Sequence, residues 1–65
     1  MTIYNNLKEF RSKNNVTQEQ LAEVIGVSRQ TIIAIEKGNY IPSLLLAMQL
    51  AKFFKLDVEE LFVNK

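Results

Sequence analysis

The chain has no cysteine and no histidine among its 65 residues. These two absences exclude disulfide bonds, thiolate nucleophiles and the most common metal ligands. Sixty-five residues predict a single domain spanning residues 1–65, which is small enough for its stability to be marginal. We therefore expect no metal and no cofactor, and we expect a partner subunit to supplement the hydrophobic core.

Long apolar segments are also missing. No stretch approaches the roughly 18 apolar residues that a membrane span requires, and the N-terminus lacks the layout of a signal peptide, so a cytoplasmic protein is expected. Without histidine or cysteine, a general base would have to be a carboxylate or a lysine, and no pair of acids marks a pocket. An enzyme is therefore not expected. Because the formal net charge is only +1, attraction to nucleic acid would depend on where the charges lie.

Capping patterns mark the starts of helices. At Thr17 the hydroxyl can cap a helix whose third residue, Gln20, reaches back to the Thr17 amide. The same pattern, complete or partial, recurs further along the chain. The expected helix starts directly follow Thr17, Ser28, Ser43 and Asp57.

Apolar periodicity and glycine complete the outline of the fold. Ile3, Leu7 and Phe10 recur at helical spacing and predict a first helix that fades into the polar residues after it. Gly26 and Gly38 each follow an apolar-periodic segment, where a left-handed residue usually ends a helix. The sequence thus predicts an all-α fold, a bundle of five helices.

Residues 17–37 combine these signals into two short helices joined by a tight glycine turn, which is a helix-turn-helix. In such a unit the first residues of the second helix enter the major groove of DNA, and here they are Arg29, Gln30 and Thr31. Arginine can donate two hydrogen bonds to guanine, and glutamine can pair with adenine. An ordinary solvated first turn is the alternative interpretation of these residues.

Other candidate contacts lie on and around the second helix. Ile33 is expected to be more exposed than Ala34, and it could contact thymine methyl groups or serve as a peripheral core or dimer residue. Phosphate contacts are expected from a helix N-terminus, a cap and the loop after the second helix, although plain surface positions would look the same. These candidates are Gln18, Ser28, Lys37, Asn39 and Tyr40.

Arg11 and Glu36 form a second kind of constellation. Arg11 follows Phe10 at the edge of the first apolar stripe, and Glu36 ends the second helix of the unit beside Ile35. A partly buried pair between the two would tie the first helix to the recognition helix and hold its angle. Its role would be structural.

The chain resembles the phage-repressor type of helix-turn-helix, that is, the lambda and 434 repressor and Cro-like superfamily, or XRE family. The stretches that carry this resemblance are Thr17 to Ala22, Gly26 to Ile32, Ile35 to Gly38 and Tyr40 to Leu44. The resemblance covers Leu7 to Phe62. It implies a lambda-repressor-like bundle of five helices and DNA binding as a homodimer on a two-fold symmetric operator. It also implies transcriptional regulation, usually repression.

The resemblance further implies roles for single residues. Positions matching Arg29, Gln30 and Ala34 read bases, those matching Gln18 and the 37–40 loop hold phosphates, and those matching Arg11 and Glu36 form a buried pair. Where larger members place a long polar reader, this chain has Ala34. Readout is therefore expected to use fewer side chains and thymine methyl groups.

The dimer contact is expected near the two chain ends, which could meet as a short β pairing. Its candidate residues are Ile3, Phe62 and Val63, although the same side chains could simply close the core of one subunit. A protein-interaction module, such as an antitoxin or adaptor with this fold, remains the alternative to a DNA-binding regulator.

Overall fold

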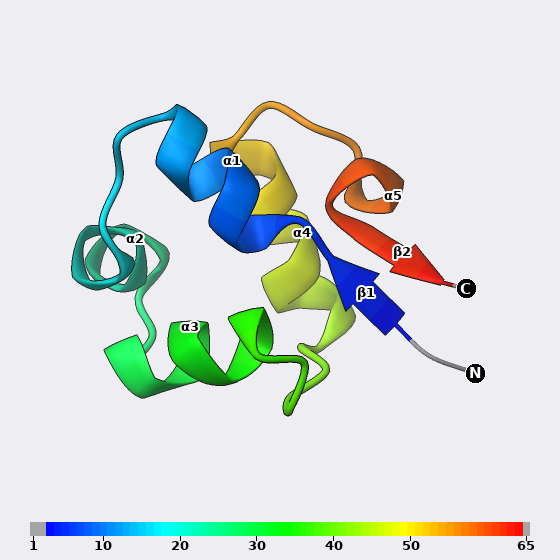
Figure 1. Cartoon of the computed structure of the whole chain (residues 1–65), viewed down its shortest axis with the longest axis horizontal. Coiled ribbons are helices and arrows are strands. Elements are labelled where there is room, and N and C mark those ends of the chain that lie inside the picture. The colour runs from blue at the N-terminus through cyan, green and yellow to red at the C-terminus, as the bar shows by residue number, and fades with distance from the viewer. Residues whose placement is uncertain (1–2, 65) are drawn as a thin grey trace.

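The computed structural model of the protein describes residues 3–64 and contains, within them, five helices and one small sheet (Figure 1). The elements in chain order are β1 (Ile3–Asn5), α1 (Leu7–Lys13), α2 (Gln18–Ile25), α3 (Arg29–Glu36), α4 (Leu44–Phe53), α5 (Val58–Leu61) and β2 (Phe62–Asn64). The expected bundle of five helices is confirmed, and so is the short pairing of the chain ends.

Side-chain caps determine where the helices begin. The Thr17 hydroxyl accepts the Gln20 N–H at 3.0 Å, and the Gln20 side-chain oxygen accepts the Thr17 N–H at 2.9 Å. The hydroxyls of Ser28 and Ser43 each accept the backbone N–H three residues ahead, both at 3.2 Å. Each such bond satisfies a backbone donor that has no partner inside the helix. The helices α2, α3, α4 and α5 begin directly after Thr17, Ser28, Ser43 and Asp57, as expected.

Four helices end on the same kind of left-handed turn. In each, a residue with positive φ follows the helix, and the next N–H donates to a carbonyl five residues earlier at 2.9 to 3.0 Å. The four left-handed residues are Asn15, Gly26, Gly38 and Lys55. The two glycines were expected. No atom lies within 4 Å of where their Cβ atoms would stand, so backbone angle alone favours glycine there.

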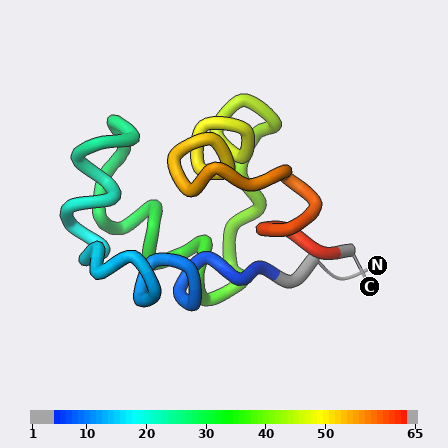
Figure 2. Tube along the Cα trace, turned by 90° about the horizontal axis from the view of Figure 1, so that it is seen from above, coloured from blue at the N-terminus to red at the C-terminus, as the bar shows by residue number. Residues whose placement is uncertain are grey.

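The two strands join the ends of the described chain. β1 and β2 pair antiparallel with Tyr4 opposite Val63, and Figures 1 and 2 both place the two termini at the same end of the molecule. The expectation that Ile3 opens the first helix is wrong, because its backbone pairs with β2 instead. The helix begins at Leu7, where the Asn5 side-chain oxygen accepts the Leu7 N–H at 3.2 Å.

The hydrophobic core lies where all five helices meet. The fully buried side chains are Leu7, Leu21, Ile32, Ile35, Leu50 and Leu61. Helices as short as α2 and α3 do not persist alone in water, so this shared core is what holds them in place. Between residues 3 and 64, none of the helices combines the length and the apolar character that crossing a bilayer requires.

Lys55 offers a test of the left-handed helix ends. An L-residue other than glycine pays roughly 1 to 2 kcal/mol for this conformation, and glycine gives back about 0.5 to 1 kcal/mol of that through its greater loss of chain entropy. Lys55→Gly should therefore raise the free energy of unfolding by about 0.5 kcal/mol in a urea titration. Lys52→Gly, an exposed change inside α4, should lower it by about 1 kcal/mol. A Lys55→Gly protein less stable than the wild type would contradict this account.

Candidate nucleic-acid interface

The helices α2 and α3 pack directly against each other across a three-residue turn (Figure 1). Gly26, at φ +90°, reverses the chain after α2. Val27 packs half-buried against the core, and Ser28 caps α3. A left-handed residue, an apolar anchor and a cap thus fix both the direction and the first residue of α3.

An ion pair connects α1 to the last residue of α3. The Arg11 Nε atom donates to Glu36 Oε2 at 2.8 Å, and Arg11 Nη2 donates to Glu36 Oε1 at 3.3 Å. The two side chains are only 13% and 6% exposed, so water screens the attraction weakly. The pair expected between these residues is therefore present, with the two parallel hydrogen bonds that suit a guanidinium and a carboxylate.

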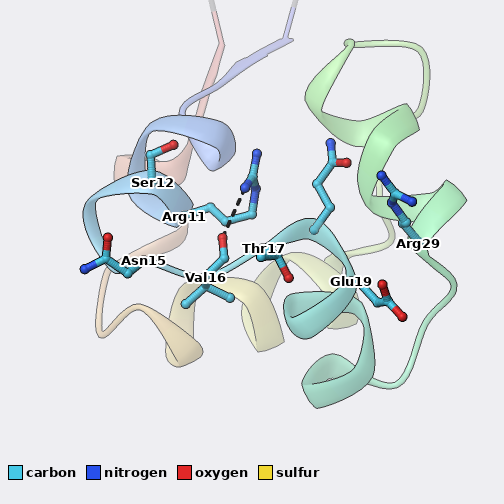
Figure 3. Close-up of a pocket in the computed structure, with 8 residues that line it drawn as sticks. Arg11, Ser12, Asn15, Val16, Thr17, Glu19 and Arg29 are labelled. Carbon is cyan, nitrogen blue, oxygen red and sulfur yellow. Dashed lines mark hydrogen bonds between the residues drawn. The ribbon is translucent and has the colours of Figure 1, made fainter.

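The same carboxylate also holds α2. The Gln18 Nε2 atom donates to Glu36 Oε1 at 3.1 Å. Arg11 Nη1 also donates to the Val16 carbonyl at 3.1 Å, and Figure 3 shows this second bond. Three segments therefore converge on the end of α3: α1, the loop before α2, and the first residue of α2. The sequence predicted only a phosphate contact for Gln18 and not its bond to Glu36. A glutamine at the first position of a helix has the same sequence signature whether its side chain is solvated or bonded to another helix.

The first turn of α3 carries both free and engaged polar side chains. Arg29 and Gln30 are exposed, and within residues 3–64 neither side chain is held by a hydrogen bond or ion pair. Thr31 is half-buried, and its hydroxyl lies 3.0 Å from the Ser28 hydroxyl. Arg29 and Gln30 are thus free to meet a ligand, whereas Ser28 and Thr31 already serve the start of the helix.

An open hollow of about 680 Å³ lies between the start of α2 and the start of α3 (Figure 3). Its lining residues are Arg11, Ser12, Asn15, Val16, Thr17, Gln18, Glu19 and Arg29. The first-turn N–H groups of a helix lack intrahelical partners and carry partial positive charge, which suits an anion. Of the two arginines in its lining, Arg11 is already paired with Glu36, so the exposed Arg29 is the cation that remains available to an anion there.

Further along α3, Ile33 and Ala34 are both half-buried. Ile33 is therefore only partly exposed, and it is not among the half-buried side chains that pack against the core. What remains accessible on both residues is apolar, a chemistry that matches the methyl group of thymine.

The loop after α3 presents the other expected phosphate candidates. Lys37, Asn39 and Tyr40 are all exposed. The left-handed turn at Gly38 orders this loop, since the Gly38 N–H donates to the Ile35 carbonyl at 3.0 Å. A cation, an amide and a phenol are thereby held next to the C-terminal end of α3.

The candidate dimer residues lie at the two ends of the chain, on β1 and β2. Phe62 and Val63 are half-buried, and Phe62 packs against the core of its own subunit. The side chain of Ile3 lies outside the described residues. A further contact was not anticipated: the Asn5 Nδ2 atom donates to the Ile35 carbonyl at 2.8 Å and ties β1 to the end of α3. No local sequence pattern marks this long-range bond.

Known proteins resemble this chain over most of its length. A helix-turn-helix family model matches residues 7–61. The chain belongs to the helix-turn-helix family. It is 59% identical over 59 residues to an HTH-type transcriptional regulator of Methanocaldococcus jannaschii, covering 91% of this chain and 89% of the relative. It is 50% identical over 58 residues to the HTH-type transcriptional regulator YgzD of Bacillus subtilis, covering 89% and 88%.

Solved structures support the same assignment. The restriction-modification controller protein C.AhdI from Aeromonas hydrophila superposes with a TM-score of 0.76 and 30% sequence identity, over 83% of this chain and 82% of that one. The lambda-repressor-like fold implied by the sequence is therefore confirmed. The family of this helix-turn-helix protein consists of transcriptional regulators, which are typically not enzymes.

The bridge between Arg11 and Glu36 predicts a large loss of stability when one partner is removed. Arg11→Met leaves the Glu36 carboxylate with little water and no cation, which typically costs about 3 to 5 kcal/mol. Urea unfolding followed by circular dichroism should show this loss, and the double variant Arg11→Met with Glu36→Leu should recover part of it.

The matched control is the pair between Lys13 and Glu9. These side chains are 63% and 59% exposed and 4.0 Å apart, so Glu9→Gln should cost less than about 0.5 kcal/mol. If Arg11→Met and Glu9→Gln lowered the free energy of unfolding equally, the buried pair would stabilise the protein no more than the exposed one.

Proposed function

We propose that this helix-turn-helix protein binds double-stranded DNA sequence-specifically and represses transcription. The observation that carries the proposal is that the first residues of α2 and α3 border one hollow, with the Arg29 side chain exposed at its edge. A duplex presents phosphates and base edges within a few ångströms of each other. A surface that offers helix N-termini beside free polar side chains is suited to both.

In the proposed complex, the start of α3 lies in the major groove. Arg29 donates two hydrogen bonds to guanine, and Gln30 pairs with adenine, because both side chains are exposed and uncommitted. Thr31, Ile33 and Ala34 make shorter contacts, the last two with thymine methyl groups. The small size of Ala34 lets the helix approach the base edges closely.

Phosphate contacts then fix the register of the protein on DNA. Gln18 contributes the backbone N–H at the start of α2 while its side chain holds Glu36. Ser28 contributes at the start of α3. The loop residues Lys37, Asn39 and Tyr40 reach the other strand of the groove, where an exposed cation and two polar groups suit the backbone.

A homodimer on a two-fold symmetric operator completes the proposal. Two recognition helices about 34 Å apart reach successive major grooves, and the two half-sites together supply an affinity that one short helix does not. A dimer seated on an operator blocks other proteins from that segment of DNA, which is the physical basis for repression.

Salt dependence separates this function from its alternative, a module that binds only another protein. With the five phosphate contacts proposed for each subunit, ten per dimer, the affinity for a duplex should fall by about 10⁵-fold between 50 and 200 mM salt, because binding releases counterions. Fluorescence anisotropy with a labelled duplex measures this slope. A nearly flat response, or no binding at the lowest salt, would favour the protein-interaction alternative.

Single substitutions separate base reading from phosphate contact. Gln30→Ala should weaken binding to the preferred site by about 1 to 3 kcal/mol and relax selection at one base pair. Lys37→Ala should weaken preferred and random duplexes alike. Both side chains are exposed, so neither change should alter the helical circular dichroism spectrum. If Gln30→Ala weakened both duplexes equally, Gln30 would not be a base reader.

A further inference from the structure

Helix α4 has two apolar faces, and its own subunit covers only one of them. The inward face consists of Leu46, Ala47, Leu50 and Ala51, which are all buried. The outward face consists of Leu44, Leu45 and Met48, together with Ile41 in the segment just before the helix, and all four are more than half exposed. Within α4, Leu44, Leu45 and Met48 stand at positions i, i+1 and i+4, which lie near one another on a helix surface. We call the four residues the outer α4 face.

The outer α4 face is large for so small a protein. A helix that is apolar on both sides is normally buried on both sides. Four large side chains exposed together form a patch within the range of about 300 to 600 Å², the size at which an apolar patch on a monomer is often functional. A standard protein interface buries about 800 Å² on each partner, so this face with a polar rim reaches the required size.

The chemistry of the face favours a protein partner. No Asp, Glu, Lys or Arg occurs from residue 38 to residue 51, although these residues make up 23% of the chain. Loss of charge together with enrichment in methionine and large apolar side chains is typical of the centre of a protein interface. A phosphate backbone or an anionic lipid surface would need cations among these residues.

The rim of the face supports pairing with a second copy. A second open hollow, of about 620 Å³, begins at Met48 and continues along the junction of α4 and α5. Its lining carries two cations, Lys52 and Lys55, and two carboxylates, Asp57 and Glu59. In a two-fold contact the same surface appears on both partners, so the lysines of one copy can face the carboxylates of the other.

The position of the face also fits the spacing that DNA demands. Recognition helices about 34 Å apart each lie about 17 Å from the two-fold axis. The molecule measures 30 × 22 × 20 Å, so this distance is smaller than any of its dimensions. The outer α4 face follows α3 directly in the chain, and Figure 2 shows α4 along one side of the molecule, away from α1. The half-buried Phe62 and Val63 offer much less free apolar surface.

We propose that the outer α4 face is the surface on which a second copy of this chain docks, with the 52–59 rim as its charged border. The inference rests on the proposed function, since that function requires a two-fold pair. It replaces Phe62 and Val63 as the centre of the dimer contact.

The test is the oligomeric state of the full chain, measured by sedimentation equilibrium. The wild type should sediment at twice its 7.5 kDa chain mass. Leu45→Glu should weaken dimerisation by at least about tenfold, since a buried unpaired carboxylate is added to each subunit. Val24→Glu is the matched control, because Val24 on α2 is 63% exposed and Leu45 is 67% exposed. It should leave the dimer unchanged.

A second measurement locates the contact directly and does not depend on the stability of a charged variant. Because the chain has no cysteine, Leu45→Cys and Val24→Cys each introduce a single thiol. A short bismaleimide should crosslink the first protein into dimers and leave the second monomeric. Equal crosslinking of both, equal effects of both glutamates, or a wild type that stays monomeric with and without DNA would overturn the proposal. The last result would assign the face to a different protein.

DNA binding to a single half-site keeps the two proposals apart. If Leu45→Glu is monomeric and still binds a half-site with the wild-type salt slope, both proposals hold. If the wild type dimerises through this face and binds no duplex, the interface stands and the proposed function fails. If a monomeric wild type binds a half-site normally, DNA binding stands and the proposed interface fails.

Discussion

One carboxylate, that of Glu36, holds the proposed recognition surface together. It accepts two hydrogen bonds from Arg11 on α1 and one from Gln18 on α2, and it ends α3 itself. A charge with so little exposure is tolerated only when its oxygens are satisfied. Any rotation of α3 against the other two helices would break at least one of these bonds, so the need to pair a single charge constrains the angle of the whole helix.

The starts of the helices could be predicted from the sequence because their causes are local. A cap and the amide that it serves are three residues apart, so Thr17, Ser28 and Ser43 reveal them without knowledge of the fold. The ends of the helices were predicted only where a glycine stands at the left-handed position, at Gly26 and Gly38. Glycine indicates a left-handed residue and asparagine does so more weakly, so Asn15 carried a signal that was not used, whereas Lys55 takes the same conformation without any compositional signal.

The candidate site was less predictable than the fold, because it depends on contacts between distant segments. Arg11 and Glu36 could be paired in advance since each stands at the edge of an apolar stripe. The partner of Gln18 could not be foreseen, because N1 residues are usually solvated and only the fold brings this one to Glu36. The relative exposure of Ile33 and Ala34 stays a prediction, since helical phase alone does not say how far a neighbouring element covers a side chain and both residues are half-buried.

A division of labour among the polar side chains follows from this arrangement. The side chains of Gln18, Ser28 and Thr31 already make hydrogen bonds that hold the helices, and replacing such a bond by one to a new partner gains less than forming a bond from a free side chain. The side chains of Arg29 and Gln30 make no hydrogen bond within the described residues, and both are exposed. Hydrogen-bonded base reading by this domain would therefore rest mainly on two long side chains per subunit, with Thr31, Ile33 and Ala34 adding shorter contacts. Two long side chains discriminate over only a few base pairs, so the proposed function needs a second copy of the chain to read a longer site. The uncharged outer α4 face therefore affects DNA recognition indirectly, by bringing that second copy into place.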